Sequence, residues 1–568
     1  ERLRMSQPPV GGQALPGARP PVPHPLCPGP AATMHEDPTA SGVTDREVLG
    51  ASVQGVRARR TDAPFGGICP TFLGLPGGTH FVTATFSAGS NRLLLFELAS
   101  LTDPGGGSAP LSPVAEARLP TRLGFGRAVL DGVLDTLRGV FTLQRPWTDL
   151  FRALRNGVGR IFRDTSGGAY MFLETEGSRV WVVVPVEMDQ DGPGYERGDS
   201  ALLRFEVVGG TLQAEDPVVL TEVPKGDTLV AALPFWPTGG PGGPAARTWY
   251  VTRRGQVGLV GSAGSGFALP APLQLDTGER IQNSFAVNQR GAFVVSNRAL
   301  YRIELTAGTL KVVWRRPYDR MGGPPKPGQI DSGSGTTPTL VGDDWVAICD
   351  GAEQMKLAVY RQDDGTLAAS EVVFPSAGRK SACESSVVGV AWDDPNAPPA
   401  AGTSNPSTVS FLVGNTYGYV HPFDTHYQWQ GGLARLDFHP ANPTVLTRRW
   451  DQPFDVMGAP PKLSIADGRL YCYARKPPIR GGFCPWFRRR TWALQGIDLR
   501  TGSLDFEVET DSGRERQSRH PFQLIFRDRP DAFDNCWASF TVLSDGSVVV
   551  ALWEGFLRIY PGPSSAPR

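Results

Sequence analysis

The stretch from Glu279 to Glu384 decides the fold of this 568-residue chain. It reads ERIQNSFAVNQRGAFVVSNRALYRIELTAGTLKVVW at 279–314, GSGTTPTLVGDDWVAICDGAEQMKLAVYRQDDGTL at 333–367, and SACE at 381–384. Each half consists of short runs rich in β-branched and aromatic residues, separated by turns, which is typical of antiparallel strands. Two four-stranded sheets in succession predict the blades of a β-propeller.

The same pattern continues along the chain and predicts a single all-β propeller domain over residues 49–568. The last stretch, SFTVLSDGSVVVALWEGFLRIY at 539–560, supplies only three strands. Because an unpaired strand edge is unfavourable, we expect SVQGVRARR at 52–60 to complete this blade. That arrangement predicts eight four-stranded blades, and seven is the alternative if residues 226–276 are irregular.

A Pro-rich arm, residues 1–48, precedes the propeller. It has almost no apolar periodicity, and its composition favours an extended chain over a packed core. An ordered arm needs a surface to lie against. Two alternatives follow: the arm packs on a neighbouring subunit, or it lies on its own propeller.

Residues 125–163 interrupt the strand pattern and predict a helical hairpin inserted into the propeller. Apolar residues follow helical spacing on both sides of Pro146. The second segment sets Trp147 and Phe151 on an apolar stripe and Arg152 and Arg155 opposite it, which suits a partner groove or a membrane surface. Packing of the hairpin on the propeller's own flank is the favoured alternative.

Composition excludes some classes of function. The 56 basic and 56 acidic side chains balance, so no overall field favours nucleic acid. No run approaches the roughly 20 apolar residues needed to span a bilayer. The abundance of Gly (68) and Pro (52) agrees with many turns and many short strands.

The seven cysteines contain no CxxC pair, which disfavours structural zinc. The sequence begins with Glu1 and not Met, which favours removal of a signal peptide, with a fragment as the alternative. We therefore expect an extracytoplasmic location: periplasmic, cell-surface or secreted. In an oxidising compartment, Cys472 with Cys484 and Cys349 with Cys383 are the first disulfide pairs to test.

Several stretches resemble a family of uncharacterised secreted bacterial proteins with quinoprotein-like propellers, built from pyrroloquinoline-quinone-type (PQQ-type) repeats. They are IQNSFAVNQRGAFVVSNRALYRI, GSGTTPTLVGDDWVAICD, SACESSVVG, NTYGYV, PPKLSIADGRLYCYA and the blade ending ALQGIDLRTGSLDFEVE, within residues 280–560. The resemblance implies the fold more than an activity. Asp350 to Glu353 and Gly414 to Tyr417 depart from the family's polar motifs, which puts a shared chemistry in doubt.

The same resemblance raises the question of a quinone cofactor. Quinoprotein dehydrogenases use a vicinal disulfide, a Glu and an Asn that hold Ca²⁺, and a catalytic Asp. Glu384 and Asn415 match the calcium ligands by residue type, but the chain has no Cys-Cys pair. No cofactor is therefore predicted, and PQQ with Ca²⁺ is the less favoured alternative.

Polar residues recur where the first strand of successive blades begins. The innermost strands line the channel of a propeller, so these side chains should converge at one of its mouths, where they suit a polar ligand. The candidates are Asn283, Thr336, Glu384, Lys462 and Asn535. The alternative, which we favour, is an ordinary polar channel with a Lys–Glu ion pair.

A second, weaker group is His421, Asp424 and His426, which have the residue types of a metal site but the spacing of a loop. No metal is predicted on this basis. The chain also lacks G-x-S-x-G, HExxH and P-loop motifs, so nothing favours a hydrolase or a nucleotide-binding protein.

Two functions remain. The first, which we favour, is a non-catalytic extracytoplasmic propeller that acts as a binding or assembly subunit, attached to a protein partner through residues 1–48 and 125–163. The second is an enzyme with a polar active site at the channel mouth, for example a quinoprotein-like oxidoreductase.

Overall fold

The computed structural model describes most of the chain. The described residues are 4–7, 12–27, 29–49, 56–61, 71–85, 91–99, 112–120, 169–236, 247–261, 269–376, 378–395, 406–419, 429–456, 460–476, 492–510, 533–535, 537–552 and 555–561. Within these residues there is no α-helix. The helical hairpin expected at 125–163 lies outside them.

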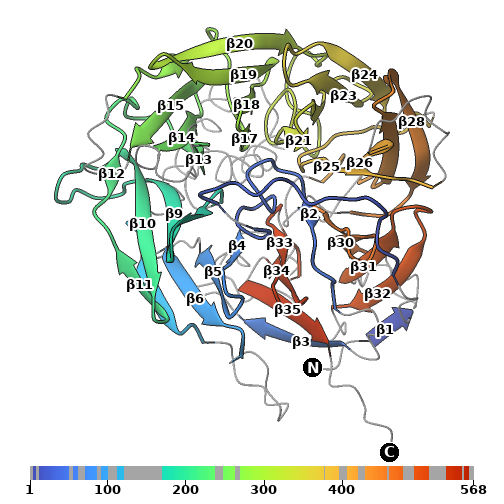
Figure 1. The fold of residues 1–568 in the computed structure, drawn as a ribbon, viewed down its shortest axis with the longest axis horizontal. Coiled ribbons are helices and arrows are strands. Elements are labelled where there is room, and N and C mark those ends of the chain that lie inside the picture. Colours follow the sequence, from blue (N-terminus) through green and yellow to red (C-terminus); the bar gives the residue numbers. More distant parts are fainter. Residues whose placement is uncertain are drawn as a thin grey trace, which may run out of the picture.

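Eight sheets stand as blades around a centre, which confirms the eight-bladed propeller (Figure 1). Blade 1 contains β4 (Phe72–Gly74), β5 (His80–Thr85), β6 (Arg92–Glu97) and β7 (Ala115–Arg118), and blade 2 contains β8 (Phe172–Glu176), β9 (Arg179–Glu187), β10 (Ser200–Val208) and β11 (Thr211–Ala214), with β12 (Val218–Val219) also paired to β10. Blade 3 contains β13 (Leu229–Pro234), β14 (Arg247–Thr252), β15 (Gln256–Gly261) and β16 (Leu273–Gln274). Blade 4 contains β17 (Ala286–Asn288), β18 (Gly291–Val295), β19 (Ala299–Thr306) and β20 (Thr309–Pro317).

The second half of the ring repeats this order. Blade 5 contains β21 (Thr339–Val341), β22 (Trp345–Cys349), β23 (Lys356–Arg361) and β24 (Leu367–Val372), and blade 6 contains β25 (Val388–Trp392), β26 (Thr408–Gly414), β27 (Leu433–His439) and β28 (Asn442–Gln452). Blade 7 contains β29 (Lys462–Ser464), β30 (Arg469–Arg475), β31 (Trp492–Asp498) and β32 (Leu504–Glu509). Blade 8 contains β33 (Phe540–Val542), β34 (Val548–Leu552), β35 (Gly555–Pro561) and β3 (Val56–Thr61). The four-stranded sheet of β13 to β16 excludes the seven-bladed alternative.

The ring closes between the two ends of the propeller. β3 pairs antiparallel with β35, from Val56 opposite Pro561 to Thr61 opposite Phe556. The N-terminal strand therefore completes blade 8, as the sequence predicts, and the outer edge of β35 is covered. Blade 7 has two additions: β1 (Arg4–Gln7) on the outer edge of β32, and β2 (Val43–Thr44) parallel to β29.

Apolar burial joins neighbouring blades. All seven residues of β26 are buried, because each sheet is covered by a blade on either side. One cluster combines Phe293 and Val295 of blade 4 with Val346 and Ile348 of blade 5. Burying such side chains between sheets contributes on the order of 1.5–3 kcal/mol each relative to exposure.

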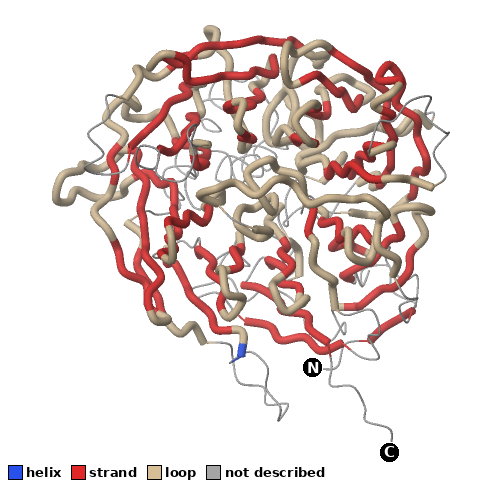
Figure 2. Tube along the Cα trace, viewed as in Figure 1, coloured by secondary structure: helices blue, strands red, loops and turns tan. Residues whose placement is uncertain are grey.

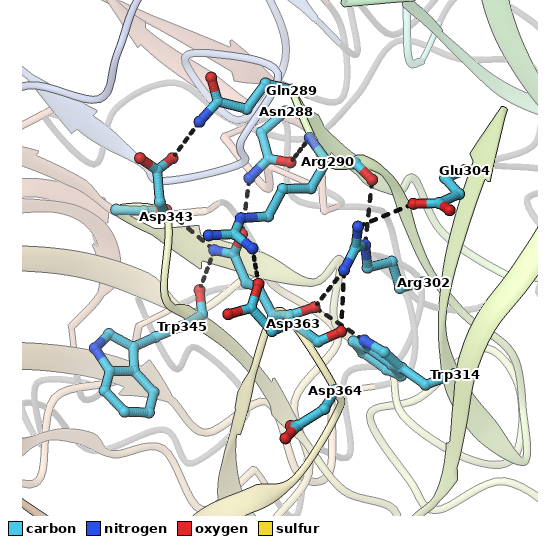
Figure 3. Close-up of polar contacts among 12 residues, drawn as sticks. Asn288, Gln289, Arg290, Arg302, Glu304, Trp314, Asp343, Trp345, Asp363 and Asp364 are labelled. Atoms are coloured by element: carbon cyan, nitrogen blue, oxygen red, sulfur yellow. Dashed lines mark hydrogen bonds and ion pairs between the residues drawn. The ribbon is translucent and has the colours of Figure 1, made fainter. Parts of the chain in front are cut away.

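A tryptophan also joins blade 4 to blade 5 (Figure 3). The indole N–H of Trp314 on β20 donates to the carbonyl of Gln362 in the β23–β24 turn at 2.9 Å. The ring lies on Gly365, where a Cβ would come within 2.6 Å of Trp314 Cδ2, and Gly365 has a φ of +70°. Across the same joint Arg290 pairs with Asp363. The turn therefore accepts only glycine without a shift of the tryptophan.

The same joint recurs between blades 6 and 7. Trp450 on β28 donates its indole N–H to the carbonyl of Leu499 at 2.9 Å. Its ring lies on Gly502, where a Cβ would be 2.7 Å from Trp450 Cδ2 and φ is +72°. Gly502 belongs to the ALQGIDLRTGSLDFEVE stretch, so this blade ending receives the tryptophan of the preceding blade.

Apart from β1, the described part of the arm crosses the centre of its own propeller; it is the dark-blue line in Figure 1 and is drawn mostly as loop in Figure 2. The N–H of Leu15 donates to Ile465 in blade 7 at 3.0 Å, and the carbonyl of Pro16 accepts from Asp393 beside blade 6 at 2.8 Å. Of the two alternatives for the arm, the described residues show the second.

Candidate functional site

The structure places the five predicted polar residues at equivalent points of their blades. Each lies within five residues of the first residue of an innermost strand: Asn283 before β17, Thr336 before β21, Glu384 before β25, Lys462 at the start of β29 and Asn535 before β33. All five are buried. Each residue thus stands near the start of an innermost strand, but the five side chains have different hydrogen-bond partners.

Asn283 and Glu384 form the centre of one polar cluster. Asn283 Nδ2 donates to the carbonyl of Gly335 at 2.6 Å and to Glu384 Oε1 at 3.3 Å. The hydroxyl of Tyr170 donates to Asn283 Oδ1 at 3.1 Å, and the amide of Ile330 donates to Glu384 Oε2 at 3.1 Å. Residues from four separate parts of the chain thus meet in one hydrogen-bonded chain.

Burial sets the protonation of this cluster. It raises the pKa of Glu384 to about 8, against which the bonds from Ile330 and Asn283 act. Burial and the Glu384 carboxylate also raise the pKa of Tyr170. Glu384 is therefore mostly protonated at neutral pH, and a neutral carboxyl group can donate a proton or a hydrogen bond.

Tyr170 is a member of this cluster that sequence reasoning does not single out. It lies two residues before β8, the innermost strand of blade 2. The same register rule that singles out Asn283 and Glu384 could have found it. The sequence does not mark this tyrosine as a site residue, because its place in an apolar run (AYMF) is typical of a core residue.

Thr336 supports the cluster and does not face it. Its hydroxyl accepts from the amide of Cys349 at 3.2 Å and exchanges a bond with Ser334 Oγ at 2.9 Å. The neighbouring Gly335 is tightly enclosed, because a Cβ there would overlap the carbonyl of Cys383 and come within 2.5 Å of Glu384 Oε2. This close approach lets the Gly335 carbonyl reach Asn283.

Lys462 is bonded to the arm. Its Nζ lies 3.2 Å from Glu36 Oε1 and donates to the carbonyl of Met34 at 2.9 Å, and both charged side chains are fully buried. The expected Lys–Glu ion pair does exist, but Glu36 takes the place of Glu384. Glu36 lies in the Pro-rich arm, where no local pattern marks it.

Asn535 serves its own blade. Its Nδ2 donates to the carbonyl of Ala551 at 2.9 Å, and its main-chain carbonyl accepts from Ala538 at 3.0 Å. Of the five candidates, the structure thus brings Asn283 and Glu384 together, with Thr336 beside them. Lys462 and Asn535 have other partners.

His35 of the arm is buried close by. Its ring contacts Thr337 Oγ1 and Ser386 Oγ, each at 3.1 Å. Burial, with the charge of Lys462, lowers the pKa of His35 to about 3. A small cavity lies between the arm and the propeller and is lined by His35, Asp37, Tyr170 and Ser284 among others. The cluster and the arm therefore share one buried region.

Glu384 and Asn415, which match calcium ligands by residue type, already have hydrogen-bond partners within the protein. Asn415 Oδ1 accepts from the amides of Ala382 and Tyr417, both at 3.1 Å, and its Nδ2 donates to the carbonyl of Gly431 at 2.8 Å. The oxygens of Glu384 are likewise bonded to protein donors. In the described ranges no three His, Cys, Asp or Glu residues gather as metal ligands. The donor sets present therefore give no support to PQQ with Ca²⁺.

Other predicted site residues lie outside the described residues. These are the metal candidates His421, Asp424 and His426, and the partner candidates Trp147, Phe151, Arg152 and Arg155. Asp350 to Glu353 is one of the two places where the chain differs from the polar motifs of the family it resembles. Here Asp350 accepts from the amides of Ala352 and Lys356 at 3.2 and 2.8 Å, and burial raises its pKa to about 6. These bonds close the turn after β22.

The described cysteines are free thiols: Cys27, Cys349, Cys383 and Cys472 are all buried, and none of them forms a disulfide. The expected disulfide between Cys349 and Cys383 is therefore absent, although the two thiols are in contact and their hydrogen bond and burial raise the pKa of Cys349. Cys484, the expected partner of Cys472, lies outside the described residues.

Comparison with known proteins does not assign a family. No family model matches the chain. A 120-residue segment is 32% identical to an uncharacterised protein of Archaeoglobus fulgidus, and the match spans 20% of this chain and 23% of that protein's length. The secreted quinoprotein-like family thus stays a prediction.

Similar solved structures are the WD40 domain of SCAP from fission yeast (9% identity, TM-score 0.40, 89% of this chain and 95% of that one), BamB from Moraxella catarrhalis (9%, 0.30, 69% and 100%) and the β-propeller domain of Nup133 from Vanderwaltozyma polyspora (10%, 0.36, 69% and 100%). At these similarities they bear on no question of function. Among the described residues, no helix has the length and hydropathy to cross a membrane.

Proposed function

We propose that this protein is a non-catalytic binding or assembly subunit. The observation that carries the proposal is the pairing of Lys462 with Glu36 and Met34. The one ammonium among the five candidate residues is occupied by the chain's own arm. The channel mouth that would otherwise hold a polar ligand is thus filled from within, which favours binding through the outside of the propeller.

The proposed attachment is the segment 125–163. Its predicted apolar stripe with Trp147 and Phe151, opposite Arg152 and Arg155, is suited to a groove on a protein partner. The described arm residues 12–27 and 29–49 are not part of the proposed attachment, because they lie against the chain's own propeller. The balanced charge of the chain gives no support to nucleic acid as the partner.

The test is the size of the native assembly. The tagged chain is isolated from its source organism and its mass is measured by light scattering, for wild type and for an Arg152→Glu/Arg155→Glu variant. Arg197→Glu, on an exposed loop of blade 2, is the control. A discrete complex that the double variant loses and the control keeps supports the proposal. A monomer in all three samples would overturn it.

A second candidate is an enzyme at the cluster around Glu384. The observation in its favour is a carboxyl group with a pKa of about 8 in line with Asn283 and Tyr170. Thermal unfolding against a panel of small polar metabolites tests it. A compound that stabilises the wild type but not Glu384→Gln would favour this candidate over the first.

We also propose an extracytoplasmic location. The resemblance of residues 280–560 to secreted quinoprotein-like propellers motivates it, and the neighbouring free thiols of Cys349 and Cys383 allow a test, because they can lose two hydrogen atoms to oxidised glutathione and form a disulfide in an oxidising compartment. Mass spectrometry of native, alkylated protein tests the idea. A Cys349–Cys383 linked peptide agrees with an oxidising compartment, and two alkylated thiols contradict it.

A further inference from the structure

We propose that residues 31–49 are a strap that runs once around the channel and closes the ring of blades from inside. This role is separate from that of β3, which closes the ring at its outer edge. It is independent of whether the protein binds a partner. Four sets of observations carry the inference.

The first is the order of the main-chain hydrogen bonds. The carbonyls of the strap accept N–H groups of the innermost strands in the order in which the blades follow one another. They are Ala31 from Gly74 in blade 1, Ala32 from Leu173 in blade 2, Pro38 from Val287 in blade 4, Thr39 from Leu340 in blade 5, Ser41 from Gly389 in blade 6, and Gly42 from Leu463 in blade 7, at 2.8–3.1 Å.

The circuit is completed at blade 8, where the N–H of Leu49 donates to the carbonyl of Gly546 at 2.8 Å. Blade 3 is reached by side chains, because Leu233 of β13 lines the same cavity as Met34 and His35. One segment therefore bonds to seven of the eight blades and shares a cavity with the remaining one, blade 3. It also satisfies donors on inner strand edges that the blades themselves leave unpaired.

The second set is the buried ion pair. Glu36 of the strap and Lys462 of blade 7 are fully buried, and Glu36 Oε2 also accepts from the amide of Ala31 at 2.7 Å. If the strap left, Lys462 would lose its counter-charge inside the channel. An unpaired buried charge is strongly unfavourable, so this contact ties the strap to the folded ring.

The third set is the backbone of the strap. Ala31, Glu36, Ala40 and Leu49 have positive φ angles of 65, 80, 54 and 60°. Non-glycine residues adopt such angles only where the surroundings enforce them. The strap therefore has a conformation that the channel imposes, and it should not persist when the segment is free.

The fourth set is polar side chains that lock the strap. Asp37 accepts from the amide of Thr39 at 2.7 Å and from the hydroxyls of Thr39 and Ser41. His35 bonds to Thr337 of blade 5 and Ser386 of blade 6. These groups give the strap a fixed shape that matches the channel.

The test separates the strap from the ring by a single cut. A protease recognition sequence is inserted between Leu49 and Val56 of the full chain, which is then folded and cleaved. Cys27, buried in the arm, and Cys472, buried in blade 7, report by alkylation on arm release and on ring opening. We expect the cleaved arm to co-elute with the propeller, and both thiols to become reactive at the same urea concentration.

Two results would overturn the proposal. One is a cleaved arm that elutes apart from a folded propeller. The other is Cys27 that reacts at low urea while Cys472 stays protected, because the arm would then be a passive plug.

The rate at which the cleaved arm dissociates can also be compared between variants. Glu36→Gln removes the charge opposite Lys462, and we expect the cleaved arm to dissociate roughly a hundredfold faster or more. Val22→Ser, at an exposed position of the arm, is the matched control and should leave the rate unchanged. If Glu36→Gln does not fold, Ser41→Ala removes one hydroxyl from Asp37 and should still accelerate release. An unchanged rate in the folded variant contradicts the strap.

Discussion

Lys462 and Glu36 form an ion pair, 3.2 Å from Nζ to Oε1, in which neither side chain touches solvent. One partner starts the innermost strand of blade 7 and the other lies in the Pro-rich arm. The pair therefore joins a regular element to an irregular one across the channel. Its energetics can be measured directly.

Removing one charge of this pair should be far worse than removing both. Lys462→Met leaves a buried carboxylate without a counter-charge, and we expect the free energy of unfolding in urea to fall by about 3–5 kcal/mol. The double variant Glu36→Gln/Lys462→Met should recover most of the loss. A single variant as stable as wild type would show that Glu36 finds water or another donor.

The tryptophan joint predicts a contrast between two glycines. Gly365 and Gly308 have similar φ angles, +70 and +75°, but only Gly365 lies against a ring, since nothing is within 4 Å of a Cβ at Gly308. Gly308→Ala should cost about 1 kcal/mol from the backbone alone. Gly365→Ala should cost roughly 1–3 kcal/mol more, because the new methyl group displaces Trp314. Equal losses in chemical denaturation would argue against the joint.

Two histidines of the arm predict sensitivity to acid. Burial lowers the pKa of His24 and of His35 from 6.5 to about 3. Between pH 6.5 and 3 the unfolded chain binds more protons at these sites than the folded chain, so they make stability fall as pH falls through this window. Each contributes about 1.4 kcal/mol per pH unit at most.

The check is the urea midpoint from about pH 7 to about pH 4, a range that begins above the window of the two histidines and covers most of it. His35→Gln can keep a bond to Thr337 or Ser386 and should flatten the profile. His80→Gln, at the half-buried first position of β5, is the control variant. A His35→Gln profile parallel to that of the wild type would disprove the role of this histidine.

Glu384 predicts the opposite dependence at higher pH. Burial raises its pKa from 4.5 to about 8, so the folded chain holds the extra proton between these values. Its contribution to stability is full below pH 4.5 and is lost as pH rises to 8 and above. Glu384→Gln, which stays neutral, should be more stable than wild type at about pH 9 relative to about pH 5. A difference that does not change with pH would mean that the carboxyl group titrates normally.

The fold could be predicted to the level of blades. Alternation of apolar and polar residues predicts the strands. The C-terminal stretch has only three strands, which predicts that an N-terminal strand, β3, completes the last blade. Strand patterning is local in sequence, so it survives without tertiary information. The tryptophan joints could be predicted only in part: the sequence indicates the glycine turn at Gly502, but it does not indicate that Trp450 contacts this turn.

The candidate site could be predicted only as a set of positions. The register places Asn283 and Glu384 at equivalent points of blades 4 and 6, and they do touch. The same rule groups Lys462 with Glu384, but position in a strand does not fix which carboxylate is nearest. Only the tertiary structure selects Glu36 over Glu384.

The architecture follows from the sequence alone: eight repeating sheets, the closing strand, and polar residues at the channel end of the inner strands. The place of the arm, in contrast, depends on the tertiary structure. The arm binds largely through main-chain carbonyls, from Ala31 to Gly42, and every residue type has the same carbonyl. Such contacts leave no pattern in the sequence. The position of the Pro-rich segment is therefore defined only by the folded channel that surrounds it.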